Sequence, residues 1–327
     1  MTIDAHFHYI PEFYLKYISE PNNPFQDVLT KTGEGYRISN AAGFSYPVEK
    51  NFYQRSAIVS HMDQMELDQV MLSISPSLFH YEMEPQAGAD FCRKVNLDML
   101  EFSAEYPGRI IPTGTVPLQD IPLAIEELRF CHSQGIKAIQ ISCRMPGKSF
   151  DDSLFLPFFL ECERLHMTIL FHPGNLHLEN GILSNYYLSN VFGCPLETSL
   201  LVAAFIFGGV LDKVPNLKII LCHSGGFIPY IIGRMKHGYE VRPEPKIHGA
   251  KSPELYMKHF YFDTLIFEPK QLSFLIDYVG ADHVVVGTDH GFDMGMYQPV
   301  DFVRQMQLSA QDENKILSEN LLNLLQA

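Results

Sequence analysis

The sequence predicts an α/β protein folded as a (β/α)8 barrel, the TIM-barrel architecture. Eight strand-like runs alternate with helical runs along the chain, and this alternation is typical of a parallel sheet covered by helices. Continuously apolar runs such as Ile219-Ile220-Leu221 indicate strands that are buried on both faces. The count of eight favours a closed barrel over an open doubly wound sheet. No G-x-G-x-x-G motif follows an early strand, which counts against a dinucleotide-binding fold.

The individual elements follow from the spacing of the apolar residues. We expect strands at 2–9, 69–74, 109–116, 136–142, 167–172, 217–222, 260–263 and 284–287. Helices are expected at 56–67, 87–106, 121–133, 156–166, 197–213, 227–239 and 270–278, before two closing helices that end at Leu325. Residues 10–55, rich in Pro, Asn, Gly and Tyr, predict an irregular insertion that caps the barrel mouth. Residues 1–327 are thus expected to form a single domain.

Charge and cysteine content limit the possible partners. The net charge of −14, from 24 basic and 38 acidic residues, argues against a nucleic-acid surface but leaves an anionic small molecule possible as substrate. The six cysteines form no C-x-x-C pair and indicate free thiols in a reducing compartment. The sequence starts on a strand without a secretory leader, and no run of about 18 apolar residues predicts a membrane span. We therefore expect a cytoplasmic protein without a membrane partner.

Five residues with metal-binding side chains stand at the ends of the expected strands. His6 and His8 are two apart on the first strand, so both side chains point to the same face. His172, His223 and Asp289 each end a later strand. The carboxyl ends of all the strands meet at one mouth of a barrel, where such enzymes place their active sites. We therefore expect these five side chains to converge.

Three imidazoles and a carboxylate suit a divalent metal of borderline character such as Zn²⁺. Such an ion lowers the pKa of a bound water and polarises a carbonyl or phenolic oxygen. A lone histidine at a strand end is more often an ordinary polar residue. The prediction of a metal site therefore depends on all five residues standing at the carboxyl ends of predicted strands. Asp263 also ends a strand but has no evident partner. Histidines outside this set, among them His290, are expected at the surface or rim.

Two further features leave alternatives open. The run His223-Ser224-Gly225-Gly226 is compatible with an anion site at a helix start or with a tight strand-to-helix turn. Arg234 and Arg242 could bind a substrate carboxylate in bidentate fashion, or they could be ordinary surface charges.

The motifs that carry these residues resemble the amidohydrolase superfamily. They are His6-Phe7-His8, Phe171-His172-Pro173, Cys222-His223-Ser224-Gly225-Gly226 and Gly287-Thr288-Asp289. The resemblance is closest to the amidohydrolase-2 branch, which includes the aminocarboxymuconate-semialdehyde decarboxylases. It extends over nearly the whole chain and is densest from 167 to 295.

The resemblance implies a barrel that holds one Zn²⁺, or Mn²⁺ in some relatives. His6, His8, His172 and Asp289 would be its ligands, and His223 would act as acid and base beside the metal. Arg234 and Arg242 would bind substrate carboxylate, with Arg234 acting in the neighbouring subunit of a homodimer. Phe292 would pack on the substrate, and the implied reaction is a non-oxidative decarboxylation.

Three departures from the family pattern concern the pocket. Ile58 stands where relatives carry an arginine, with Arg55 about one helical turn away. A pocket tryptophan is replaced near Asn190, and His290-Gly291 replaces the usual Tyr-Pro. The leading hypothesis is therefore a metal-dependent decarboxylase, a carboxy-lyase, of a small aromatic or unsaturated carboxylic acid. The alternatives are a hydrolase or hydratase that uses the same metal-bound water, for example on a lactone, and a binding protein without catalysis.

Overall fold

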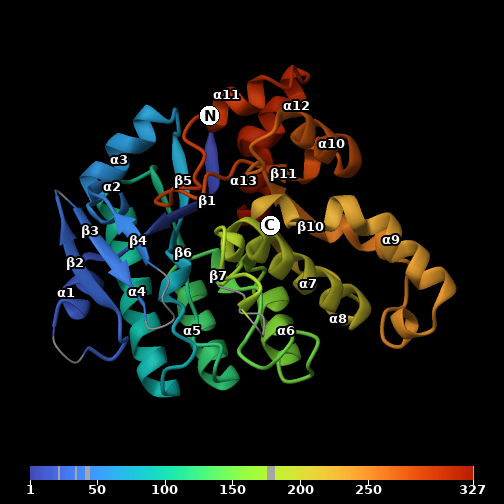
Figure 1. Cartoon of the computed structure of the whole chain (residues 1–327), viewed down its shortest axis with the longest axis horizontal. Helices are drawn as coiled ribbons and strands as arrows, with labels where there is room; N and C mark the ends of the chain where they lie inside the picture. The colour runs from blue at the N-terminus through green and yellow to red at the C-terminus, as the bar shows by residue number, and fades with distance from the viewer. Residues whose placement is uncertain (21–22, 34, 41–44, 175–180, 327) are drawn as a thin grey trace.

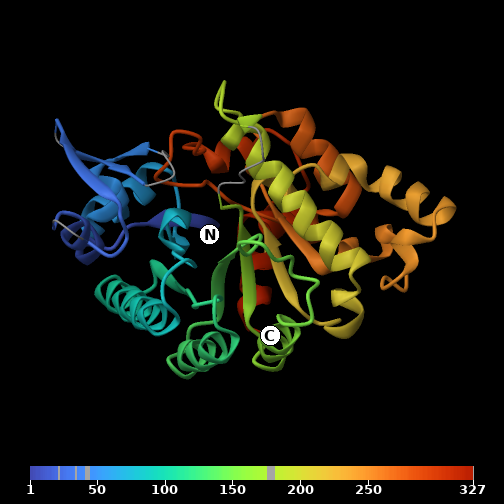
Figure 2. The same ribbon diagram turned by 60° about the horizontal axis from the view of Figure 1, so that its bottom comes forward.

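Eight parallel strands form one sheet that curls into a barrel (Figures 1 and 2). The computed structural model describes residues 1–20, 23–33, 35–40, 45–174 and 181–326. In sheet order, the strands are β1 (Ile3–Tyr9), β5 (Gln69–Ile74), β6 (Ile110–Gly114), β7 (Ala138–Ser142), β8 (Thr168–His172), β9 (Lys218–Leu221), β10 (Phe260–Asp263) and β11 (Val284–Val285). Parallel bridges from Asp4 to Val286 and from Phe7 to His290 join the first strand to the last. The predicted (β/α)8 barrel is confirmed.

Helices follow the strands, and all but the last cover the outside of the barrel (Figure 2). They are α3 (Arg55–Gln64), α4 (Pro85–Glu105), α5 (Ile121–Ser133), α6 (Leu156–Arg164), α7 (Cys194–Phe207), α8 (Val210–Lys213), α9 (Ile228–Val241), α10 (Pro269–Val279), α11 (Pro299–Arg304), α12 (Ala310–Asn314) and α13 (Asn320–Gln326). The last helix, α13, packs its Leu321 and Leu324 against the interior of the barrel. The helix expected at 197–213 is interrupted because Gly209 has φ +70°, and a Cβ there would lie 2.5 Å from the carbonyl oxygen of His248.

A change of register in β1 turns its histidines toward the barrel axis. Ile3 and Ala5 pack in an interior cluster with side chains of α13. Further along the strand, Phe7 and Tyr9 belong to the larger outer core, and the pairing with β5 shifts register between Asp4 and Phe7. Without that shift, strict alternation would place His6 and His8 on the face opposite Ile3 and Ala5. The irregularity therefore brings both imidazoles inside the mouth.

The insertion between β1 and α3 is more regular than the sequence suggested. It contains α1 (Glu12–Ile18), a short α2 (Lys50–Tyr53) and an antiparallel sheet of β2 (Val28–Thr32), β3 (Gly35–Ser39) and β4 (Ser45–Val48). Figure 1 shows this sheet at one side of the barrel. Its buried side chains, Ile38, Tyr46 and Val48, join the outer core. Its role as a cap over the mouth stays a prediction.

One helical stretch, Ser189–Phe207, is long and apolar enough by length and composition to cross a bilayer. The sequence prediction missed it because Pro195 and Glu197 interrupt the apolar run. In the fold it is a short π-helical segment (Ser189–Gly193) continued by α7, whose side chains Val202 and Phe205 are fully buried. The buried side of this stretch therefore packs against the barrel.

Candidate active site

The predicted residues from β1 and from the segment that follows β11 meet at the carboxyl ends of the strands. Asp289 Oδ1 lies 3.2 Å from His6 Nε2 and 3.0 Å from His8 Nε2. The two Nε2 atoms are 3.0 Å apart. All three side chains are buried. This is the convergence that the sequence predicted.

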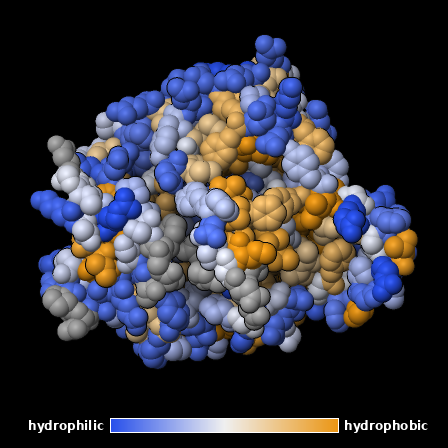
Figure 3. Space-filling view, viewed as in Figure 1, coloured by the Kyte–Doolittle hydropathy of each residue, from blue (hydrophilic) through white to orange (hydrophobic). Residues whose placement is uncertain are grey.

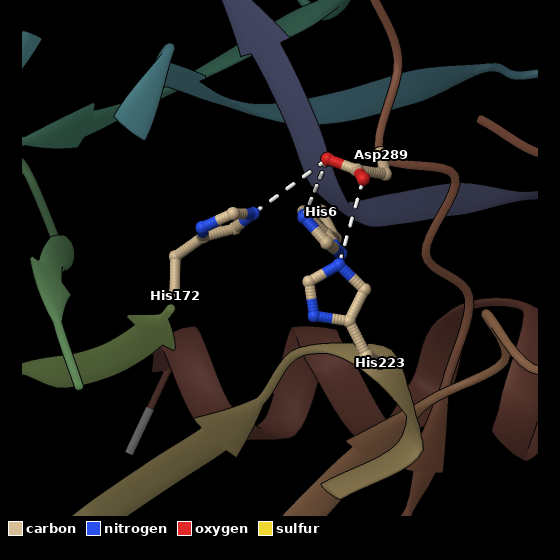
Figure 4. Close-up of side chains that lie close together, drawn as sticks. All are labelled: His6, His172, His223 and Asp289. Atoms are coloured by element: carbon tan, nitrogen blue, oxygen red, sulfur yellow. Dashed lines mark hydrogen bonds and ion pairs between the residues drawn. The ribbon is translucent and has the colours of Figure 1, made fainter. Parts of the chain in front are cut away.

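His172 and His223 complete the group from the opposite side (Figure 4). His172 Nε2 lies 3.6 Å from Asp289 Oδ1, and His223 Nε2 lies 3.5 Å from Asp289 Oδ2. One ligand atom from each of His6, His172, His223 and Asp289 lies within 4.8 Å of the other three, a geometry that could hold a metal ion. That set includes His223 and not His8, although His8 Nε2 also lies 3.0 Å from Asp289. Distances therefore do not decide which of these two histidines would be the fourth metal ligand.

Hydrogen bonds to the other ring nitrogen fix the orientation of three imidazoles. The Nδ1 atoms of His6, His8 and His172 face Asp263 Oδ2 at 2.7 Å, the Ile74 carbonyl at 3.1 Å and the Pro173 carbonyl at 2.7 Å. Each partner is an acceptor, so each Nδ1 carries a proton, and whenever the ring is neutral its Nε2 presents a lone pair.

Lone pairs that face one another repel unless a cation lies between them. Among the described residues, His172 Nε2 and Asp289 Oδ1 are buried without a hydrogen-bond partner, although such atoms are nearly always satisfied. The donor set and its unsatisfied atoms therefore fit a divalent metal ion.

Three of the four predicted ligands are held in the charge state that a metal requires, and His6 is the exception. Burial lowers the pKa of His8 and, more strongly, that of His172, so both remain neutral ligands. Burial would raise the pKa of Asp289, but His6, His172 and His223 hold it well below its usual range. Burial would lower the pKa of His6, but Cys222, Asp289 and Asp263 raise it well above its ordinary value. A metal must therefore displace a proton from His6, and its affinity rises with pH.

Asp263 contributes more than its sequence position suggested. Its carboxylate accepts the His6 Nδ1–H, and it accepts the backbone N–H groups of His223 at 3.0 Å and Ser224 at 2.7 Å. One side chain thus orients a metal-facing imidazole and shapes the turn after β9. That turn uses its N–H groups within the protein, which favours the tight-turn interpretation of 223–226 over an anion site.

Both His223 and Asp289 adopt a left-handed backbone conformation, with φ +54° at each. Such a conformation costs a residue other than glycine about 1–3 kcal/mol and often occurs at functional sites.

His290 corrects one prediction. It is completely buried rather than at the rim, and its ring stacks on Phe7 at 3.9 Å between centroids. Its Nε2 faces the Asn51 carbonyl at 2.8 Å, and burial lowers its pKa to about 3. His290 is therefore a neutral core residue behind the site.

Ile58 and Arg55 of α3, where the sequence departs from the family pattern, do not line the cavities at the barrel mouth. Ile58 is fully buried in the outer core. Arg55 contacts Asp98 Oδ1 and Glu105 Oε2, each at 2.9 Å. Arg55 therefore does not take the place of the arginine that the family resemblance implies at position 58.

A cavity of about 50 Å³ lies against His172, His223 and Asp289. Phe292 and Asn190 also line it, and the Phe292 ring meets the His8 ring edge-on at 5.7 Å. Tyr187, Cys194, Pro76, Ser77, Pro173 and Gly174 complete the wall. Phe292 thus lines the cavity beside His172, His223 and Asp289, and its contact with a substrate stays a prediction.

Arg234 and Arg242 do not line this cavity within the single chain. Arg234 is exposed on α9. Arg242, just beyond the helix, forms an ion pair with Glu244. Their predicted role at the site of a neighbouring subunit stays a prediction.

A barrel with imidazoles and a carboxylate at its carboxyl-terminal strand ends defines the class of metal-dependent barrel hydrolases and lyases. The chain belongs to the Amidohydro_2 family (Amidohydrolase), whose profile matches residues 3–325. It is 31% identical over 285 residues to a 2-amino-3-carboxymuconate-6-semialdehyde decarboxylase of Dictyostelium discoideum, covering 86% of this chain and 79% of the relative. The family predicted from the sequence is confirmed.

Solved structures share the fold at lower identity. The apo form of Metarhizium anisopliae IDCase superposes with a TM-score of 0.88 at 20% identity, over 99% of this chain and 97% of the other. A dihydroxybenzoic acid decarboxylase from Polaromonas sp. JS666, with bound manganese and the inhibitor 2-nitroresorcinol, gives a TM-score of 0.79 at 20% identity, over 99% and 96%. At this identity the likeness shows the fold.

Proposed function

We propose that the protein is a metal-dependent, non-oxidative decarboxylase, a carboxy-lyase, of a small aromatic or unsaturated carboxylic acid. The observation that carries this proposal is the group of inward-facing Nε2 lone pairs around Asp289, beside a cavity walled by Phe292. Decarboxylases among the relatives support the reaction.

His6, His8, His172 and Asp289 would hold the metal, either Zn²⁺ or Mn²⁺. His8 is preferred to His223 as a ligand because its Nδ1 has a carbonyl acceptor. The Nδ1 of His223 is buried without a hydrogen-bond partner among the described residues. When bound, the metal would supply Lewis-acid polarisation of a substrate oxygen.

His223 would transfer the proton. Its Nε2 lies at the cavity, and Asp289 Oδ2 at 3.5 Å stabilises the protonated ring. The protonated Nε2 donates its proton to the carbon that bears the carboxylate. The adjacent carbon–carbon double bond of the substrate supplies the electron pair of this new C–H bond. The bond from that carbon to the carboxyl carbon then breaks, its electron pair re-forms the double bond, and CO₂ leaves.

Phe292 would pack on the face of the substrate and exclude water from this step. Asn190 lines the same cavity near the position where the family resemblance implies a tryptophan, and its side chain is smaller and more polar than an indole. The substrate of the chain can therefore differ from those of its relatives.

A homodimer would bring Arg234 and Arg242 to the site of a second subunit, where they would bind substrate carboxylate. Support comes from an exposed apolar face near α7 and α9, where Figure 3 shows hydrophobic side chains gathered. It includes Val191, Phe192, Leu200, Tyr230 and Ile231. Light scattering tests the dimer. We also propose a cytoplasmic location, supported by the absence of disulfides among the six cysteines.

The reaction is tested by CO₂ release from the metal-loaded protein. The substrates are 2-amino-3-carboxymuconate-6-semialdehyde and 2,6-dihydroxybenzoate, compared with a set of lactones and amides. We expect CO₂ from at least one acid and no release from protein treated with a chelator. Hydrolysis of a lactone or amide with no CO₂ from any acid would establish the hydrolase alternative instead.

A further inference from the structure

The cavity beside the metal-facing group is too small for an organic acid while its walls stay in place. Its volume is about 50 Å³, whereas a small-molecule site usually measures roughly 300–1,000 Å³. A neighbouring cavity of about 460 Å³ adjoins it at Ser77 and Gly174, but of these two cavities only the smaller is lined by His223 and Asp289. The reacting carbon must therefore enter the smaller cavity, and one of its walls has to move.

Tyr187 is the wall that faces solvent. It is 42% exposed, and it is the only exposed residue among the described ones that line this cavity. The Phe292 wall, by contrast, packs on the rings of Tyr46 and Phe52, at 5.5 and 5.2 Å between centroids. Tyr187 is therefore the side chain that can swing out of the wall without disturbing the core.

A hydrogen bond joins Tyr187 to the segment that follows β11. Its hydroxyl donates to Asp293 Oδ1 at 3.2 Å, across 106 positions of the sequence. The loop that carries Asp293 is closed by the backbone, because the Met296 N–H donates to the Thr288 carbonyl at 2.8 Å. Loss of the side-chain bond would thus release Tyr187 and leave Asp293 in place.

The backbone around Tyr187 also depends on contacts from elsewhere in the fold. Tyr186 and Tyr187 both have φ +59°, a left-handed conformation that is unfavourable for residues other than glycine. A single π-helical turn, Ser189–Gly193, follows, and such turns are rare and frequent at functional sites. A conformation that the local sequence does not favour is held by long-range contacts such as the bond to Asp293.

We propose that Tyr187 is the gate of the metal-facing cavity and that its hydrogen bond to Asp293 keeps the gate closed. Rupture of that bond lets the ring rotate into solvent, which admits the substrate and releases the product. This inference rests on the proposed function for the identity of the molecules that pass. The gate itself can be tested without turnover.

Cys194 lines the same cavity, so its thiol reports when the gate is open. Cys194 is partly exposed, whereas the other five cysteines are buried. The probe is methyl methanethiosulfonate, which transfers its methylthio group to a thiolate and releases methanesulfinate. Mass spectrometry of proteolytic peptides follows the labelling of Cys194 in the Mn²⁺-loaded full-length protein. When opening and closing are faster than labelling, the labelling rate is proportional to the open fraction.

Tyr187→Phe and Asp293→Ala should each raise the labelling rate of Cys194 roughly 3–10-fold, because a hydrogen bond stabilises the closed state by about this factor. The double variant should label no faster than either single variant, since both changes break the same bond. Asp293→Asn keeps an acceptor oxygen and should label at close to the wild-type rate.

Tyr17→Phe is the matched control. Tyr17 is 41% exposed, and its hydroxyl accepts a hydrogen bond from Lys94, but it does not line the cavity. This variant should label like the wild type. Cys194→Ser should remove the labelled peptide, and circular dichroism verifies that each variant is folded.

Wild-type labelling rates in folded Tyr187→Phe and Asp293→Ala would overturn the gate. A double variant whose acceleration equals the product of the two single effects would also overturn it, because the two residues would then act independently. The decarboxylation proposal fails separately. Accelerated labelling in a protein that releases no CO₂ from any acid rejects only the reaction, and CO₂ release with unchanged labelling rejects only the gate.

Discussion

Substitution of Asp263 by asparagine should weaken metal binding without removing any ligand. Asp263 Oδ2 accepts His6 Nδ1–H and the His223 N–H, and Oδ1 accepts the N–H groups of Ser224 and Leu265. An amide has a single acceptor oxygen, so its NH₂ group must face two of these four donors. If the oxygen stays on Ser224 and Leu265, the NH₂ group faces His6 Nδ1. The His6 proton then moves to Nε2, which removes the lone pair that a metal needs.

Loss of such a hydrogen bond to a metal-binding histidine typically costs 10–100-fold in metal affinity, or about 1.4–2.8 kcal/mol. Competition with a chromophoric chelator at constant pH measures this change for Zn²⁺ and Mn²⁺. Asp4→Asn is the control. Asp4 is equally buried and accepts the His6 backbone N–H at 2.8 Å, but it does not contact the imidazole. Wild-type metal affinity in a folded Asp263→Asn variant would refute the tautomer argument.

Three other outcomes are expected. Phe292→Ala should raise KM by roughly 3–10-fold and change kcat less, since it removes an aromatic wall worth about 1 kcal/mol; steady-state kinetics would contradict this if KM stayed constant. Burial raises the pKa of Glu197 to about 7, so the folded protein retains this proton more strongly than the unfolded chain and loses stability as pH rises from about 5 to 8. Between these two pH values the free energy of unfolding of Glu197→Gln should fall less than that of the wild type, by up to about 3 kcal/mol. Urea titrations at both pH values measure this difference, and an equal fall in the two proteins would contradict the prediction. Removal of the metal should lower the melting temperature, because 100 Kd of free ion stabilises the folded state by about 2.7 kcal/mol; an unchanged transition after dialysis against a chelator would argue against a bound ion.

The sequence was sufficient for the barrel and its convergent side chains because both depend on local rules. Apolar runs define buried parallel strands, and carboxyl ends of parallel strands meet wherever a barrel closes. His172 and Asp289 could therefore be placed from their positions alone. His6 and His8 were also placed correctly, although their inward direction depends on a register shift in β1 that no local pattern reveals.

Features that depend on distant contacts could not be predicted. Asp263 is 257 positions from His6, so its partner becomes evident only in the folded barrel. The burial of His290 depends on contacts with Phe7 and with the Asn51 carbonyl, the latter 239 positions away in the sequence. The sheet of the insertion was missed because strands such as Val28–Thr32 are largely exposed and carry little apolar periodicity.

The most direct test of the proposed site is a His223→Ala variant assayed for both bound metal and CO₂ release. If His6, His8, His172 and Asp289 hold the metal and His223 transfers the proton, the variant retains one metal ion per chain. Its CO₂ release then falls by roughly 10²–10⁴-fold, the usual contribution of a general acid. His8→Ala should instead lose the metal. Loss of metal from His223→Ala, or unchanged CO₂ release, would contradict this division of roles.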